Sequence, residues 1–303
     1  MSNIKGFNIE EFNIEEKIFP KGLNSNQIKM IAIIAMLLNH IYHIFMRSPH
    51  IHIFNTDSLT LILLRILFRY VGAITFMLMI FMLVEGFEKT KNHAKYLQRL
   101  FLFFIVSFVP FSLFATSRFF DGNIRPFLSV ERFFSTAQGN TFFDIAFIYM
   151  ASPVFNVIFT LFCGFSMLMI IQNTKSRISE IGILLFFIVL SYPSDWGGIG
   201  VIGIYIMYKL PKHNRATWGV LGFFITATLN ATMIDIYFLS SINRIPERIF
   251  NYAVTYSFML FCIPILNRYN GEKGAYNLKY LFYIFYPVHM IVLFFAYTII
   301  ISL

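Results

Sequence analysis

An all-α polytopic membrane protein is the fold class that the sequence predicts, and composition and hydropathy are the observations that predict it. Of its 303 residues, 57% are hydrophobic and 13% are charged, whereas soluble domains carry about 25% charged residues. The mean hydropathy is +0.68. Apolar runs on the scale of the ~20 residues that a membrane-crossing helix needs recur almost to the end of the chain. We therefore expect a polar, amphipathic cytoplasmic tail over 1–26 and one transmembrane helical domain over 27–303.

Hydropathy divides this domain into about nine transmembrane helices. The expected spans are 27–46, 61–87, 98–116, 142–171, 178–192, 197–210, 216–240, 250–267 and 278–302. The fourth run is too long for one straight crossing, so either Pro153 kinks it or its first half lies on the outer surface of the membrane. Asn24 or Ser25 is expected to cap the first span. Both cysteines, Cys163 and Cys262, fall in apolar runs and are expected to be buried single thiols.

Lysine and arginine in the connections predict the orientation, because cytoplasmic loops are enriched in these residues. With nine spans, four basic connections share a side with the N-terminal tail: 88–99, 172–177, 209–215 and 268–279. We therefore expect the N-terminus inside and the C-terminus outside. The cations behind the net charge of +9 fall between the apolar runs. They form no basic stripe of the kind that binds nucleic acid, so we expect no nucleic-acid partner.

The first span carries the clearest chemical signal. Its sequence KMIAIIAMLLNHIYH, from Lys29 to His43, begins with a cation and places Asn39 and His40 among apolar residues. Such groups are costly in a bilayer unless they face a protein interior or a water-filled cavity. On a helix, Lys29 and His40 lie about 16 Å apart along the axis and on nearly the same face. This pattern indicates a cation near the surface and a titratable base deep in the membrane.

Other polar residues are expected at comparable depths. His289 lies about as far into the ninth span as His40 lies into the first, so the two imidazoles reach similar depths. They either form a site or are neutral, hydrogen-bonded packing residues. Glu85 either orients a base, pairs with a cation or lies at the end of its span, and Arg69 needs a partner or water. Asn156 and Thr160 either line a cavity or bond across helices, and we favour the second interpretation.

The connection 89–99 places Lys89, Lys91, Lys95 and Arg99 beside the inner membrane surface. Clustered cations of this kind bind phosphates. A loop that only sets the orientation, or one that binds anionic lipid head groups, accounts for the same charges. Metal binding is not expected, because no Cys, Asp or Glu completes a familiar ligand spacing around the histidines.

Several short motifs occur in a fixed order along the chain. They are Lys29…Ala32…Met36…Asn39-His40, Arg69…Gly72…Phe76…Val84-Glu85-Gly86-Phe87, Thr90, Tyr96, Arg99-Leu100, Asn156–Leu161 with Gly164, Asp195…Gly200-Val201, Tyr269–Lys273, Lys279-Tyr280 and Phe285–His289. In this order, over about residues 27–295, the chain resembles the TraX family of integral membrane proteins, whose namesake is associated with N-terminal acetylation of conjugative pilin. The family usually shows Asp-His where this chain has Asn39-His40, so Glu85 would have to orient the imidazole instead.

The spacing from Lys29 to His40 is also similar to the Arg/Lys-x10-His signature of the wider transmembrane acyltransferases, in which the histidine is implicated in acetyl transfer from acetyl-CoA. The resemblance implies a bacterial, multi-pass plasma-membrane acetyltransferase that uses acetyl-CoA. The acceptor is an amine or hydroxyl of a pilin-like peptide, a glycan or a lipid. In the implied mechanism His40 is the general base.

The implied site has two groups of residues. The carbonyl of the thioester is polarised, or the oxyanion stabilised, by Asn39, His289 or Arg69. The phosphates of acetyl-CoA are bound at the inner surface by Lys89, Lys91, Lys95 and Arg99, with Lys29 also on the cofactor side. Two other functions stay open: a transporter or flippase whose histidines move protons or substrate, and a non-catalytic subunit of a conjugation or secretion system. The enzyme predicts a narrow cavity that runs from the 89–99 connection to His40 and opens to the outer side or to lipid. The transporter predicts inverted repeats about a midplane site, with discontinuous helices, and the non-catalytic subunit predicts no cavity at His40.

Overall fold

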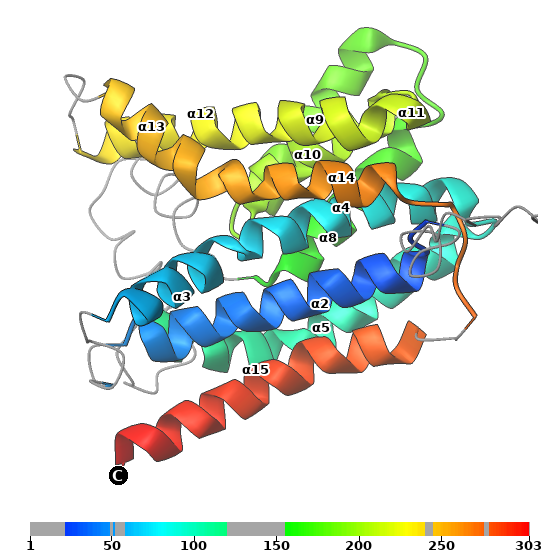
Figure 1. Cartoon of the computed structure of the whole chain (residues 1–303). Helices are drawn as coiled ribbons and strands as arrows, with labels where there is room; N and C mark the ends of the chain where they lie inside the picture. The colour runs from blue at the N-terminus through cyan, green and yellow to red at the C-terminus, as the bar shows by residue number, and fades with distance from the viewer. Residues whose placement is uncertain are drawn as a thin grey trace, which may run out of the picture.

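The computed structural model describes residues 22–48, 51, 58–119, 155–239, 245–275 and 279–302. Throughout these residues the chain is a bundle of α-helices, most of them aligned with one long direction (Figure 1). The expected amphipathic helix of the tail and residues 142–154 of the fourth run lie outside the described residues.

Six segments of the described chain are long and apolar enough to cross a membrane. They are α2 and η1 (Ser25–Ile41, Tyr42–Met46), α3 and α4 (Leu59–Tyr70, Gly72–Lys89), α5 (His93–Phe119), α11, η3 and α12 (Lys212–Asn214, Arg215–Gly219, Val220–Leu239), α13, η5 and α14 (Ile245–Tyr256, Ser257–Phe261, Cys262–Asn267), and α15 (Lys279–Ser302). The protein is therefore a helical, multi-pass membrane protein.

The helices at the expected fourth, fifth and sixth spans are shorter. They are α8 (Val157–Ile171), α9 (Arg177–Ser191) and α10 (Gly197–Lys209), with 15, 15 and 13 residues. At 1.5 Å per residue each is about 20–23 Å long, less than the ~30 Å hydrocarbon core. Three of the nine expected spans are thus too short to cross as straight helices in the described residues.

Helices α9 and α10 form a hairpin whose turn lies near the middle of the bundle. Trp196 in this turn stacks on Phe76, near the start of α4, while Lys212, just after α10, pairs with Glu88 at the end of α4. Helix α10 therefore runs beside α4 from mid-bundle to one end. At that end lie the start of α2 and the described parts of all four basic connections, and the C-terminus lies at the opposite end (Figure 1). Which end faces the cytoplasm stays a prediction.

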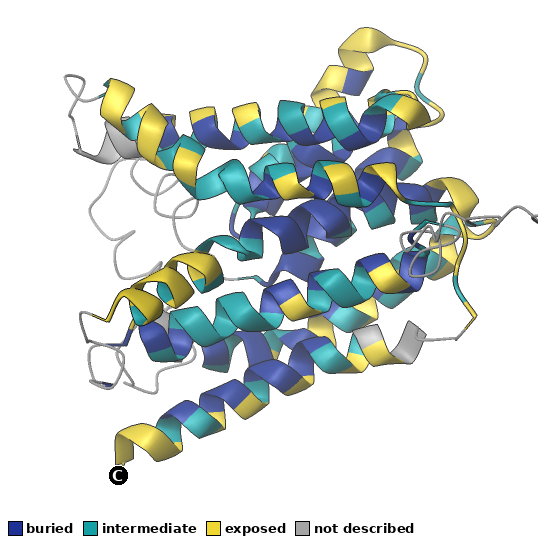
Figure 2. Cartoon of the chain, in the orientation of Figure 1, coloured by how far each residue is buried: buried dark blue, intermediate teal, exposed yellow. Residues whose placement is uncertain are grey.

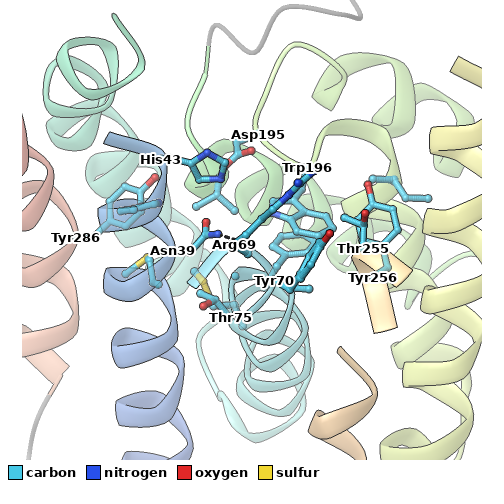
Figure 3. A pocket seen from close by; sticks show the side chains of 18 residues that line it. Asn39, His43, Arg69, Tyr70, Thr75, Asp195, Trp196, Thr255, Tyr256 and Tyr286 are labelled. Carbon is cyan, nitrogen blue, oxygen red and sulfur yellow. Dashed lines mark hydrogen bonds between the residues drawn. The ribbon is translucent and has the colours of Figure 1, made fainter. Parts of the chain in front are cut away.

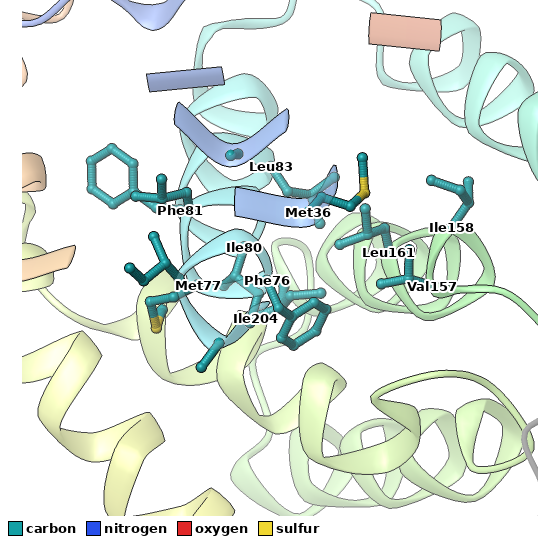
Figure 4. Close-up of a cluster of buried hydrophobic side chains, with 14 of the residues drawn as sticks. Met36, Phe76, Met77, Ile80, Phe81, Leu83, Val157, Ile158, Leu161 and Ile204 are labelled. Carbon is teal, nitrogen blue, oxygen red and sulfur yellow. The ribbon is translucent and has the colours of Figure 1, made fainter. Parts of the chain in front are cut away.

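The core is centred on α4, which packs against α2, α8 and α10. Its side chains are among the most deeply buried in the described chain, including Phe76, Met77, Leu78, Ile80 and Val84 (Figures 2 and 4). Glycines of α10 make this approach possible, because a Cβ at Gly200 would lie 2.7 Å from the ring of Phe76.

Local signals that the sequence predicted are confirmed at several positions. Asn24 caps α2 and forms a capping box with Gln27. Asn156 caps α8 and donates from its amide to the backbone oxygen of Phe104 on α5, 3.3 Å away. Thr160 also bonds to another segment, the α9–α10 turn. Cys163 and Cys262 are buried and free.

Substitution of two glycines by alanine tests the close packing of α10. A Cβ at Gly203 would lie 2.6 Å from a ring carbon of Phe223 and 2.9 Å from Ile80, whereas a Cβ at Gly182 on α9 would meet nothing within 4 Å. Gly203→Ala should lower the free energy of unfolding by about 1–3 kcal/mol, as overpacked cores do. Gly182→Ala should leave it unchanged or raise it by up to about 1 kcal/mol. Equal effects of the two substitutions on reversible unfolding in detergent would contradict this packing.

Candidate active site

Two histidines, which the sequence predicted at similar depths, meet in the middle of the bundle. Nδ1 of His40, in the last turn of α2, lies 2.8 Å from Nε2 of His289 on α15. The rings are nearly parallel, with centroids 5.0 Å apart. His289 is buried, and its Nδ1 lies 2.7 Å from the backbone oxygen of Phe285. The two imidazoles therefore form a hydrogen-bonded chain that ends on the backbone of α15.

The atoms in this chain determine where its protons lie. A carbonyl oxygen only accepts hydrogen bonds, so Nδ1 of His289 donates to Phe285, and Nε2 of a neutral His289 is an acceptor. Nδ1 of His40 then donates to His289. In a neutral His40 the other nitrogen, Nε2, keeps its lone pair. The arrangement thus holds His40 in the tautomer that accepts a proton at Nε2.

His40 forms part of the wall of a cavity of about 360 Å³, within the ~300–1,000 Å³ range of small-molecule sites. The wall is built from α2, the α3–α4 junction, α8, the α9–α10 turn, α13 and α15 (Figure 3). Its polar and aromatic members include Asn39, His40, His43, Arg69, Tyr70, Thr75, Asp195, Trp196, Thr255, Tyr256 and Tyr286. The arginine and the aspartate need a protein partner or water at this depth, so the cavity suits a polar ligand.

Asn39 and Arg69 meet where the second span is divided into α3 and α4. The side-chain nitrogen of Asn39 donates to the backbone oxygens of Phe68 and Arg69, at 3.3 and 2.8 Å. Gly72 makes room for this amide, because a Cβ there would lie 2.5 Å from Cγ of Asn39. Asn39 therefore stabilises the helix end beside the cavity, and the guanidinium of Arg69 lies 5.2 Å from the ring of Tyr70.

The turn between α9 and α10 supplies Asp195 and Trp196, two residues that the pattern of polar residues within the spans did not predict for the site. The hydroxyl of Thr160 donates to the backbone oxygen of Asp195, 2.6 Å away, and lies 2.7 Å from the hydroxyl of Ser194. Trp196 has a φ of 65°, in the left-handed region. The sequence signal for this turn was Asp-Trp-Gly-Gly between two short apolar runs.

The expected phosphate-binding residues lie at the basic end and are not part of the cavity wall. Lys89 pairs with Glu85 at 2.8 Å and donates to the hydroxyl of Tyr269 and the backbone oxygen of Gly271. Lys91 and Lys95 are exposed, and Arg99 lies 5.4 Å from the ring of Tyr96. Lys29 is half-buried near the start of α2. Glu85 is thus brought to Lys89 rather than to His40.

A buried ion pair at the same end was not predicted from the sequence, in which Arg215 counts only as a charge in a connection. Arg215 is 3% exposed and bonds through Nη2 to Glu88. Its Nη1 lies 3.6 Å from Glu85, and its Nε donates to the backbone oxygen of Leu210. Lys212 pairs with Glu88 from the solvent side. These contacts join the end of α4 to the connection that precedes α12.

The fold and site define a class: a multi-pass helical membrane protein with a histidine pair beside a polar cavity inside the bundle. The chain belongs to the TraX family, since the family described as TraX protein matches residues 24–296. A probable fimbrial assembly protein, FimC of serogroup H1 from Dichelobacter nodosus, is 28% identical over 277 residues, which cover 88% of this chain and 93% of that protein. No solved structure matches the chain.

Two substitutions around one carboxylate test the buried ion pair. Arg215→Met leaves Glu85 and Glu88 without their buried partner, and breaking such a pair costs about 3–5 kcal/mol. Lys212→Met removes a cation whose side chain is 68% exposed and 3.2 Å from the same Glu88, and should cost less than about 1 kcal/mol. The measurement is the free energy of unfolding in detergent. An Arg215→Met variant as stable as Lys212→Met would show that the ion pair is not buried.

Proposed function

We propose that this protein is a membrane-embedded acetyltransferase, which moves an acetyl group from acetyl-CoA to an amine or hydroxyl of an acceptor. The observation that carries the proposal is His40: the residue lines the cavity, and its Nδ1 is hydrogen-bonded to His289. A general base must keep a lone pair, and the proton that it abstracts must lie within hydrogen-bond reach. The tautomer held by His289 leaves the lone pair on Nε2 of His40, and the cavity provides space for a substrate.

Acetyl-CoA would approach from the basic end of the bundle. Its phosphates would be bound by exposed cations of the 89–99 connection, Lys91 and Lys95, together with Lys89, Arg99 and Lys29. The rise of α2 places His40 about 16 Å beyond Lys29 along the helix axis. The extended pantetheine arm of the donor is suited to such a separation between its phosphates and its thioester. Met36 and Thr75 line the part of the cavity on this side of His40.

In the reaction, Nε2 of His40 takes the proton from the acceptor nitrogen or oxygen as that atom attacks the thioester carbonyl. A carbon–nitrogen or carbon–oxygen bond forms, and the carbon–sulfur bond then breaks. The proton passes from His40 to the departing sulfur, so the products are the acetylated acceptor and free CoA. Arg69 lines the cavity, and its guanidinium would stabilise the negative charge on the carbonyl oxygen in the transition state. Asn39 acts as a positioning residue through α3.

The acceptor class is suggested by the relatives. The FimC relative is named a probable fimbrial assembly protein, which favours a pilin-like peptide over a glycan or a lipid. The acceptor would reach His40 from the end of the bundle opposite the basic connections, where α3 and α13 line the cavity with Tyr70 and Thr255.

A second candidate function is transport, and broken helices favour it. The second span is divided at Val71, and the α9–α10 hairpin turns at cavity level. Discontinuous helices around a site near the midplane are typical of secondary transporters. The two functions differ in a product, because only the acetyltransferase releases free CoA from acetyl-CoA.

Release of CoA thiol by the purified protein tests the role of His40. His40→Ala should lower the rate by about 10²–10⁴-fold, the usual contribution of a general base, while His213→Ala on the exposed α11 should leave it unchanged. An unchanged rate in His40→Ala, or no release by the unmodified protein, would contradict the proposal. Uptake of a solute into vesicles without CoA release would favour the transporter.

His289 is proposed as a positioning residue, so its substitution should lower kcat and leave the affinity for acetyl-CoA unchanged. His289→Phe removes the acceptor for Nδ1 of His40 and should lower kcat by about 10–100-fold, as loss of such supporting partners does in metal sites, without weakening acetyl-CoA binding. His289→Asn offers an amide oxygen to the same proton and should recover part of the rate. Equal rates in the two variants would show that the hydrogen bond is not used.

A further inference from the structure

Trp196 occupies a backbone conformation that a tryptophan rarely adopts. Its φ of 65° is the one positive φ among the non-glycine residues of the described chain. Such a conformation costs on the order of 1–3 kcal/mol and persists where the surroundings enforce it, often at functional sites. The next two residues, Gly197 and Gly198, show that glycine is used freely in this turn. A large side chain therefore occupies a position where glycine would be unstrained.

The surroundings hold the indole rigidly. The ring of Trp196 stacks on Phe76, with centroids 4.4 Å apart and planes 10° apart, and lies 6.1 Å from the ring of Tyr256. The turn is anchored on both sides, since the backbone nitrogen of Asp195 donates to Phe155 and that of Gly197 donates to Ser194. The indole cannot easily rotate away, so it forms a fixed part of the cavity wall (Figure 3).

Two buried rings pack against the ring of His40. Phe114 on α5 lies 4.5 Å from it between ring centroids, and His289 on α15 lies 5.0 Å away. Phe114 and His289 are both buried. A group bound at His40 therefore extends away from Phe114 and His289 into the cavity, whose wall also includes the stacked Phe76 and Trp196.

We infer that Trp196 restricts the donor to a short acyl group. The inference rests on the proposed function and deepens it by naming a residue that sets the acyl chain length. With the thioester carbonyl at His40, the methyl of an acetyl group fits the cavity, whereas each further methylene extends toward a wall that does not yield. A rigid apolar wall discriminates by about 10-fold or more per methylene, and the indole of Trp196 supplies such a wall among the polar groups of the cavity.

The test measures CoA release by the purified protein from acetyl-, butyryl- and hexanoyl-CoA. Trp196→Ala removes the indole and keeps a Cβ in the same strained backbone, and Trp196→Gly also relieves the strain. In both variants kcat/KM for hexanoyl-CoA should rise at least about tenfold relative to that for acetyl-CoA. Trp196→Phe should extend the range to butyryl-CoA only. The matched control is Trp218→Ala, because Trp218 is 60% exposed and does not line the cavity.

The outcomes separate this inference from the proposed function. Unchanged chain-length preference in Trp196→Ala and Trp196→Gly, with acetyl-CoA still turned over, overturns the inference and leaves the acetyltransferase in place. A change in Trp196→Gly alone also overturns it, because the effect would come from the backbone and not from the ring. If the two small variants do not fold, Trp196→Phe decides by its butyryl-CoA rate. No CoA release by the unmodified protein overturns the proposed function itself.

Discussion

The hydrogen bond between the imidazoles of His40 and His289 is the interaction on which the site depends. This bond joins the first helix of the described chain to the last, between two residues that lie 249 positions apart in the sequence. In hydrocarbon, two neutral imidazoles without partners would each cost several kcal/mol, so the pair favours the packing of α15 against α2 and α5. The same bond decides which nitrogen of His40 can accept a proton, which makes one contact serve both stability and the proposed chemistry.

The cavity lies where helices are interrupted. Helices α3 and α4 part at Val71, and α9 and α10 turn at Trp196. Inside a bilayer such breaks are tolerated only where the protein itself satisfies the freed backbone groups or where they line a cavity. Here Asn39 and Thr160 satisfy carbonyls at the two breaks. The polar residues that look costly in the sequence are thus the ones that make an opening in the bundle possible.

The sequence predicted the features that depend on local pattern. Hydropathy located the six long apolar segments of the described chain, and depth along the helices predicted His40 and His289 at one level. The sequence could not predict the partners of Glu85, because the ion pair between Glu85 and Arg215 depends on how the α10–α12 connection folds against α4. Nor could hydropathy distinguish a hairpin that enters and leaves at one end from two crossings, since α9 and α10 are apolar in either case. Trp196 was missed because a lone aromatic residue in a glycine-rich turn carries no periodicity.

A structure of the protein with a non-hydrolysable acetyl-CoA analogue would test the role of His40 most directly. We expect phosphates at the basic end and the thioester carbonyl in the cavity, with Nε2 of His40 within about 3–3.5 Å of the site of the attacking atom. We also expect Nδ1 of His40 to stay hydrogen-bonded to His289. An analogue whose acyl group lies outside the cavity, or a His40 ring turned so that Nε2 faces His289, would contradict the proposed chemistry.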